Sequence, residues 1–143
     1  MDSVLIVATL CFIWGNSILT KTQSSAGSGK LFLKFQPFFD RVFGEGVITH
    51  NIFRKIIHFY EFGLLGIEVF VLHALLGKIK PVNLIFILLY GLAVASIDEI
   101  IQIFSSRGPS VIDVVIDFCG YIFAVLVLTL FAIILRKIRK RKS

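Results

Sequence analysis

The stretch that decides the fold is DEIIQ at residues 98–102, near the end of the apolar run PVNLIFILLYGLAVASIDEIIQIF at residues 81–104. A run of this length predicts a membrane-spanning helix, because about 20 apolar residues cross the hydrocarbon core. Ionised carboxylates oppose insertion, since each costs about 2.5–3.5 kcal/mol at the bilayer centre. Asp98 and Glu99 therefore need partners on other helices or a position near the membrane surface.

The composition of the whole chain also indicates an integral membrane protein. Apolar residues make up 57% of its 143 residues and the mean hydropathy is +0.90, which leaves too little polar surface for a soluble globule. We therefore expect an all-α, integral membrane four-helix bundle that forms one domain over residues 1–143. Four runs are long enough to span, at residues 4–20, 56–76, 82–104 and 111–135.

Positive charge directly follows the last of these runs. Residues 136–142 contain six Lys and Arg side chains, and such clusters stay in the cytoplasm under the positive-inside rule. We expect a basic cytoplasmic tail at residues 136–143, and four spans then place both termini in the cytoplasm. Residues 21–55 carry six Lys and Arg of their own, spread over a longer stretch. Beside a membrane exit, the basic cluster favours anionic lipid headgroups as its partner and not nucleic acid.

A second basic segment lies between the first two spans. Over residues 30–43, helical periodicity predicts a basic face made by Lys30, Lys34 and Arg41. Such a pattern is typical of an amphipathic helix in the membrane interface, and a re-entrant or packed loop is the alternative. The Ser- and Gly-rich residues 24–29 before it predict a flexible connector. The apolar face consists of Phe32, Phe35, Phe38, Phe39, Val42 and Phe43.

Polar side chains fall at matching depths on all four spans. They lie at the ends of the first and third spans and at the starts of the second and fourth. Because successive spans run in opposite directions, these side chains meet in one leaflet, which is the outer one if the tail is cytoplasmic. Gly120 and Ala124 continue the polar stripe of the fourth span and allow a neighbouring helix to approach closely. The polar sets are Asn16 and Ser17; Arg54, His58 and Glu61; Asp98, Glu99 and Gln102; and Asp113 and Asp117.

Carboxylates, a histidine and cations at one end of a bundle can transfer protons, hold a metal ion or bind phosphate. His58 and Glu61 form a His-x-x-Glu pair one turn apart that could bind a divalent metal together with Asp98, Glu99 or Asp113, and the favoured ligand set is His58, Glu61 and Glu99. The candidate catalytic residues are His58, Glu61, Asp98, Glu99 and Asp113. The candidate substrate-binding residues are Asn16, Arg54, Lys55, Gln102, Arg107 and Asp117.

Taken together, these motifs resemble the VanZ-like membrane protein family. The segments that carry the resemblance are WGNS at residues 14–17, FRKIIHFYEFG at 53–63, DEIIQIF at 98–104, and Arg107-Gly108 followed by Asp113 and Gly120. Where the family usually has Asn, this chain has Asp117. The resemblance implies a multi-pass protein of the bacterial cell membrane that is associated with reduced susceptibility to glycopeptide antibiotics of the teicoplanin type, without a known reaction.

Three functions remain open on this reading. The polar residues could be a structural network in which cations and carboxylates pair and fix helix register. They could form a metal-assisted hydrolase or transferase that acts on a lipid substrate. They could bind an anionic lipid headgroup or a lipid-linked cell-wall precursor and limit the access of a glycopeptide. The substrate, the metal and the oligomeric state do not follow from the sequence.

Overall fold

The computed structural model describes residues 2–77, 81–105 and 110–142, and these residues form five α-helices without a strand. The helices are α1 (Asp2–Ile18), α2 (Lys21–Phe43), α3 (His50–Leu75), α4 (Pro81–Phe104) and α5 (Val111–Lys142). The all-α prediction is confirmed. The last helix continues through the basic tail as far as Lys142, so that segment is helical and not a separate extension.

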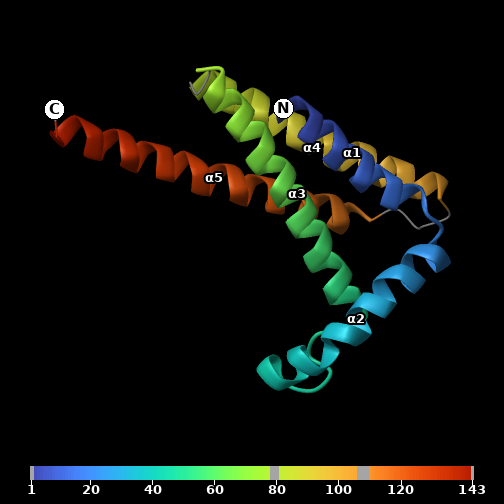
Figure 1. Cartoon of the computed structure of the whole chain (residues 1–143). Coiled ribbons are helices and arrows are strands. Elements are labelled where there is room, and N and C mark those ends of the chain that lie inside the picture. Colours follow the sequence, from blue (N-terminus) through green and yellow to red (C-terminus); the bar gives the residue numbers. More distant parts are fainter. Residues whose placement is uncertain (1, 78–80, 106–109, 143) are drawn as a thin grey trace.

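Four of these helices make up the bundle, and α2 extends away from it (Figure 1). The most extensive contact joins α3 to α5, while α1 packs against α3 and α4, and α4 packs against α5. The C-terminal ends of α1 and α4 lie on the same side of the molecule as the N-terminal end of α5 (Figure 1). This arrangement matches the predicted alternation of direction along the chain.

Within the described residues, three helices are long and apolar enough to cross a membrane, at residues 50–75, 82–104 and 111–141. The number rises to four if α1 and α2, which meet at an angle of 113°, together form one bent span. With 17 residues, α1 alone lies at the lower limit of the length that crosses the hydrocarbon core. The chain is therefore a helical membrane protein with three or four crossings.

The core of the bundle lies where α4 and α5 meet α3. Phe62 and Leu65 of α3 are fully buried there, together with Tyr121 of α5. The Tyr121 hydroxyl donates a hydrogen bond of 2.9 Å to the backbone carbonyl of Ile87 in α4. Gly91 makes room for this ring, because a Cβ atom at that position would lie 2.3 Å from it. The tyrosine thus fixes α5 against α4.

Small residues allow the backbones of α3 and α5 to touch. A Cβ atom at Gly120 would lie 2.1 Å from the carbonyl oxygen of Phe59, and one at Gly66 would lie 2.7 Å from that of Tyr121. Ala124 packs beside Gly66 one turn further along α5. The predicted close approach at Gly120 and Ala124 is therefore confirmed, and α3 is the helix that makes it.

The helix before α3 is longer than expected. Residues 24–29 are helical and not a flexible connector, so α2 begins at Lys21 instead of Lys30. A capping box starts it, in which Thr20 and Gln23 each bond the backbone N–H of the other. Such a cap satisfies two backbone groups that would otherwise lack partners and stabilises the first turn. Serine and glycine have low helix propensity, which tertiary contacts override here.

Contacts with α3 hold this part of α2 in place. Ser28 donates a hydrogen bond of 2.8 Å to the carbonyl of Ser24, and its hydroxyl lies 2.9 Å from Nε2 of His50 in α3. One turn later, Phe32 packs against His50 and Phe53 with ring centroids 5.7 and 5.5 Å away. The apolar face of α2 is therefore partly used to dock α3.

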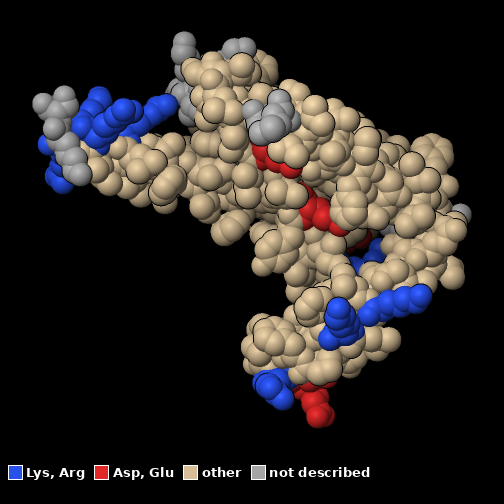
Figure 2. Space-filling model, in the orientation of Figure 1, with Lys and Arg blue, Asp and Glu red and all other residues tan. Residues whose placement is uncertain are grey.

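Basic side chains gather at two places on the molecule, at the far end of α5 and on α2, with mostly uncharged surface between them (Figure 2). The helix α5 has 32 residues and is about 48 Å long, which exceeds the hydrocarbon thickness of a bilayer. If α5 crosses a membrane, its basic end and its acidic beginning lie on opposite sides. Which side is cytoplasmic stays a prediction.

Candidate functional site

Asp98 is the most deeply buried acid of the predicted site. Its side chain has 0% exposure, and it accepts hydrogen bonds from the hydroxyl of Ser17 in α1 at 2.6 Å and the amide of Gln102 at 2.7 Å. The polar end of the first span thus meets the polar end of the third, as predicted. These bonds stabilise a carboxyl group within apolar helix, because buried polar groups are costly only when they lack partners.

Glu99 makes a different contact, which the sequence interpretation did not include. Its carboxylate accepts the backbone N–H of Ser110, the residue that precedes α5. The Ser110 hydroxyl in turn accepts the backbone N–H of Asp113 at 3.2 Å, as an N-cap residue does. Glu99 and Ser110 therefore attach the beginning of α5 to α4. The serine just before an apolar helical run was the signal that could have revealed the cap.

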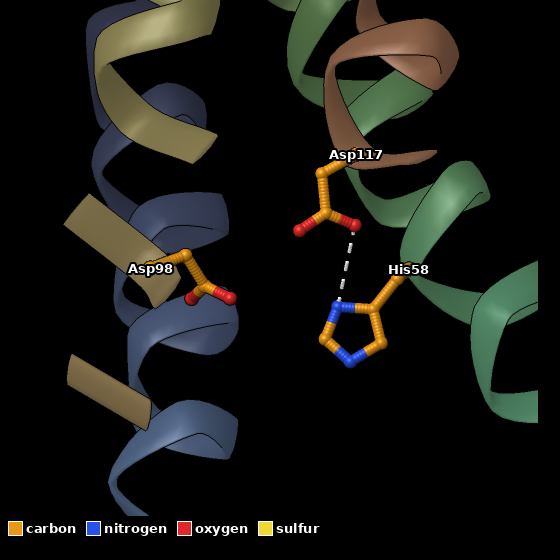
Figure 3. A group of neighbouring side chains, drawn as sticks. All are labelled: His58, Asp98 and Asp117. Atoms are coloured by element: carbon orange, nitrogen blue, oxygen red, sulfur yellow. Dashed lines mark ion pairs between the residues drawn. The ribbon is translucent and has the colours of Figure 1, made fainter. Parts of the chain in front are cut away.

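A histidine and two acids converge from three helices at the centre of the site. Nδ1 of His58 in α3 lies 3.6 Å from Oδ1 of Asp117 in α5, and Asp117 is only 2% exposed. Asp98 of α4 points into the same space (Figure 3). One potential ligand atom from each of the three residues lies within 4.8 Å of the others, which is close enough to share one metal ion.

This trio differs from the ligand set predicted from the sequence. His58 belongs to both and Asp98 was an alternative ligand, but Asp117 was not expected as a ligand, and Glu61 and Glu99 are not part of the trio. The physical reason is helix rotation, since the Glu99 carboxylate turns toward Ser110 and Glu61 lines a neighbouring cavity. Spacing along a helix fixes the depth of a side chain but not which neighbouring helix it faces.

Two cavities flank this centre. One, of about 220 Å³, lies between α3 and the beginning of α5 and is mostly polar. The other, of about 230 Å³, lies between α1, α2 and α3, and most of its exposed surface is apolar although polar side chains also line it. Arg54 and His58 line both cavities. The first is lined by Asn51, Arg54, Lys55, His58, Ser110, Asp113, Ile116 and Asp117, and the second by Phe12, Asn16, Leu19, Gln23, Ser24, Gly27, Ser28, Leu31, Arg54, Ile57, His58 and Glu61.

An ion pair lies at the edge of the polar cavity. The Lys55 ammonium is 3.2 Å from the Asp113 carboxylate, and both side chains are more than one-third exposed. Exposed pairs of this kind contribute about 0–1 kcal/mol, because water competes for both charges. Lys55 can therefore exchange its carboxylate partner for another anion at little cost.

The structure brings most of the candidate residues together, although their chemical roles stay predictions. Asn16, Arg54, Lys55, His58, Glu61, Asp113 and Asp117 line the cavities. Asp98, Glu99 and Gln102 are buried. Arg107 lies outside the described residues. Gln23, Ser24 and Ser28 also line the second cavity and were missed; Ser24 and Ser28 lie in residues 24–29, which were expected to be a flexible connector.

A comparison with protein-family models identifies the family that the sequence motifs resemble. The model of the family described as VanZ/LLP1 matches residues 3–133. This range includes every segment on which the resemblance was based and all residues that line the two cavities. Comparisons with curated proteins and with solved structures find no significant match.

Proposed function

This chain belongs to the VanZ/LLP1 family, and we propose that it binds the anionic headgroup of a lipid or lipid-linked cell-wall precursor in the outer leaflet of a bacterial cell membrane. The observation that carries the proposal is the position of Arg54, which lines both the polar cavity and the cavity beside it, whose exposed surface is mostly apolar. A lipid requires this combination, because one end of the molecule is charged and the other is not.

The polar cavity suits a phosphate group. Arg54 offers a planar set of N–H donors that matches phosphate oxygens, and Lys55 adds a second positive charge. Asn51 and Ser110 add neutral polar groups to the lining of this cavity. Because the pairing of Lys55 with Asp113 is exposed and weak, an incoming phosphate can replace the carboxylate.

The orientation of the chain determines where such a lipid would be bound. With the basic end of α5 in the cytoplasm, both cavities open toward the outside of the cell. Lipid-linked cell-wall precursors and lipophilic glycopeptides meet at that surface. Binding or withholding such a lipid would reduce susceptibility to teicoplanin. Lys30, Lys34 and Arg41 on α2 support the same placement, since each basic residue near the surface attracts anionic lipid by about 1 kcal/mol.

Replacement of one cation tests the proposal. We expect Arg54→Gln to abolish teicoplanin protection and to reduce the anionic lipid that copurifies with the protein, at unchanged protein abundance. Arg54→Lys is the matched control, because it keeps a positive charge on the lining of both cavities and should retain more of the lipid than Arg54→Gln does. Full protection and normal lipid content in the Arg54→Gln variant would refute the headgroup site.

The trio of His58, Asp98 and Asp117 favours a second candidate, a metal-assisted hydrolase or transferase of a lipid substrate. A divalent ion held by these side chains would activate water, and a nearby carboxylate such as Glu61 would act as general base. Metal analysis of the purified protein tests it, with His58→Ala and Asp117→Asn expected to release the ion. A metal-free protein that changes no membrane lipid, yet still protects, would exclude this candidate.

A further inference from the structure

The polar cavity continues into an apolar track along α3 and α5. Lys55 and Ile116 line both the polar cavity and an adjoining depression of about 400 Å³. Phe59 and Tyr60 line both that depression and a groove of about 360 Å³ between the two helices. Shared lining residues connect the three hollows in series, from Arg54 at one end to the membrane-spanning parts of α3 and α5 at the other.

The groove at the end of this track has no charged side chain among its lining residues. The backbones of α3 and α5 approach each other closely at this groove, since a Cβ atom at Gly63 would lie 3.5 Å from the carbonyl oxygen of Gly120. Exposed aromatic and aliphatic side chains form its rims. The lining residues are Phe59, Tyr60, Gly63, Leu64, Ile67, Gly120, Phe123, Ala124, Val127 and Leu128.

We propose that this track holds one hydrocarbon chain of the lipid whose headgroup binds at Arg54 and Lys55, which leaves the second cavity for another part of the same lipid, an inference that rests on the proposed function. The track follows α3 from Lys55 to Ile67, which is about 18 Å of helix at 1.5 Å per residue. One leaflet contributes about half of the roughly 30 Å hydrocarbon core. The track therefore has the length that a chain of the same leaflet needs.

The continuity of the track with the polar cavity identifies the occupant. A ligand that fills both needs an anionic group beside two cations and an apolar tail that descends from it, and a membrane lipid has both. A helix from a second copy of this chain would fill only the groove. It would leave the two cations of the polar cavity without an anion, unless one of its acidic residues faced that cavity. The track thus selects lipids by chain and by headgroup together.

The contribution of the chain is expected to be moderate. A chain that leaves the bilayer for the groove moves between two apolar surroundings, so burial from water does not drive its binding. Contact with the groove walls and the fixed position of the headgroup provide the gain. We therefore expect loss of the groove to weaken binding of long-chain lipid about fivefold, which corresponds to about 1 kcal/mol.

A tryptophan placed in the groove tests this inference. Leu64 lines the groove and is 50% exposed, so Leu64→Trp fills the space without disturbing the core. Leu126→Trp is the matched control on the surface of α5, where the side chain is 59% exposed and lines none of the track. Ile67→Trp is a second groove variant for use if Leu64→Trp fails to fold.

Two phosphatidylglycerols with the same headgroup are the probes, the dioleoyl and the short-chain dihexanoyl lipid. Native mass spectrometry of the full chain in detergent measures binding. We expect Leu64→Trp to bind dioleoyl lipid about fivefold more weakly and dihexanoyl lipid unchanged, while Leu126→Trp resembles the unmodified chain. Unchanged binding of dioleoyl lipid by a folded groove variant overturns the inference, as does an equal loss for both lipids.

Arg54→Gln separates this inference from the proposed function. Weaker binding of both lipids by this variant supports the headgroup site, whatever the groove variants do. Normal binding of both lipids by Arg54→Gln, together with a selective loss of dioleoyl lipid in Leu64→Trp, refutes the headgroup site and leaves the chain groove standing.

Discussion

The helix α3 makes two kinds of contact, one with α5 and one with α1. Toward α5, glycines bring the two backbones close together, since a Cβ atom at Gly120 would lie 2.1 Å from the carbonyl oxygen of Phe59. Toward α1, the Thr9 hydroxyl donates a hydrogen bond of 2.9 Å to the carboxyl group of Glu68. The same α1 bonds α4 through Ser17 and Asp98.

The difference shows the two means by which helices associate in lipid. Because lipid chains are as apolar as leucine, burial gives no driving force, and helices are joined by close packing or by hydrogen bonds. The packed contact has no space for an added atom. The bonded contacts of α1 with α3 and α4 can lose one bond and keep another, so each should respond less to a single substitution than the packed contact does.

The first prediction breaks the packed contact. Gly120→Ala places a methyl group against the backbone of Phe59, which cannot rotate away as a side chain would. We expect it to lower the free energy of unfolding by about 3 kcal/mol, at the upper end of the usual cost of overpacking. Reversible unfolding in mixed micelles measures the effect. Gly15→Ala is the control, since nothing lies within 4 Å of its Cβ position, and equal stability of the two variants would contradict the contact.

The second prediction removes an acceptor from the bonded contact. Asp98→Ala leaves the Ser17 hydroxyl and the Gln102 amide without the carboxyl group that they bond. We expect a loss of about 2 kcal/mol in the free energy of unfolding, within the 1–3 kcal/mol cost of unsatisfied buried groups. Asp98→Asn keeps a carbonyl oxygen for Ser17 and should lose less. The network would be irrelevant to stability if both variants unfolded like the unmodified chain.

Features that depend on depth could be predicted from the sequence. His58, Asp98 and Asp117 lie together because three helices that alternate in direction bring equal depths to one end of the bundle. Gly120 and Ala124 were expected to allow a close contact, and the structure shows it with α3. The match of the VanZ/LLP1 family over residues 3–133 confirms the resemblance that these motifs suggested.

Features that depend on helix rotation and on tertiary contacts could not be predicted. The position of Glu99 along the sequence does not show that its carboxylate accepts the backbone N–H of Ser110 instead of joining the set of metal ligands. The helical form of residues 24–29 depends on the contact of Ser28 with His50, which exists only after α3 has packed beside α2. Local composition predicted a connector there because serine and glycine favour helices only weakly.

The third prediction removes the hydroxyl of Ser17, which donates to the Asp98 carboxyl group of the second prediction. Ser17→Ala deletes the hydroxyl, while Asp98 keeps its bond from Gln102. We expect a loss of about 1 kcal/mol, because one bond is lost and the carboxyl group keeps another donor. Unfolding in the same micelles checks the value. A loss as large as that of Asp98→Ala would mean that Ser17, and not the whole network, holds α1 to α4.

The smallest effect is expected at the contact between α1 and α3. Thr9→Val keeps the shape of the side chain and removes the bond to Glu68, whose other carboxyl oxygen has no hydrogen-bond partner among the described residues. Bonds between membrane helices contribute about 0.6 kcal/mol on average, so we expect a loss of that size. A double-mutant cycle with Glu68→Leu isolates the bond, because leucine has no acceptor and the double variant should then lose less stability than the sum of the two single losses. A loss near that of Gly120→Ala would show that the bond to α1 holds α3 as firmly as the glycine contact with α5 does, and the contrast between the two contacts would disappear.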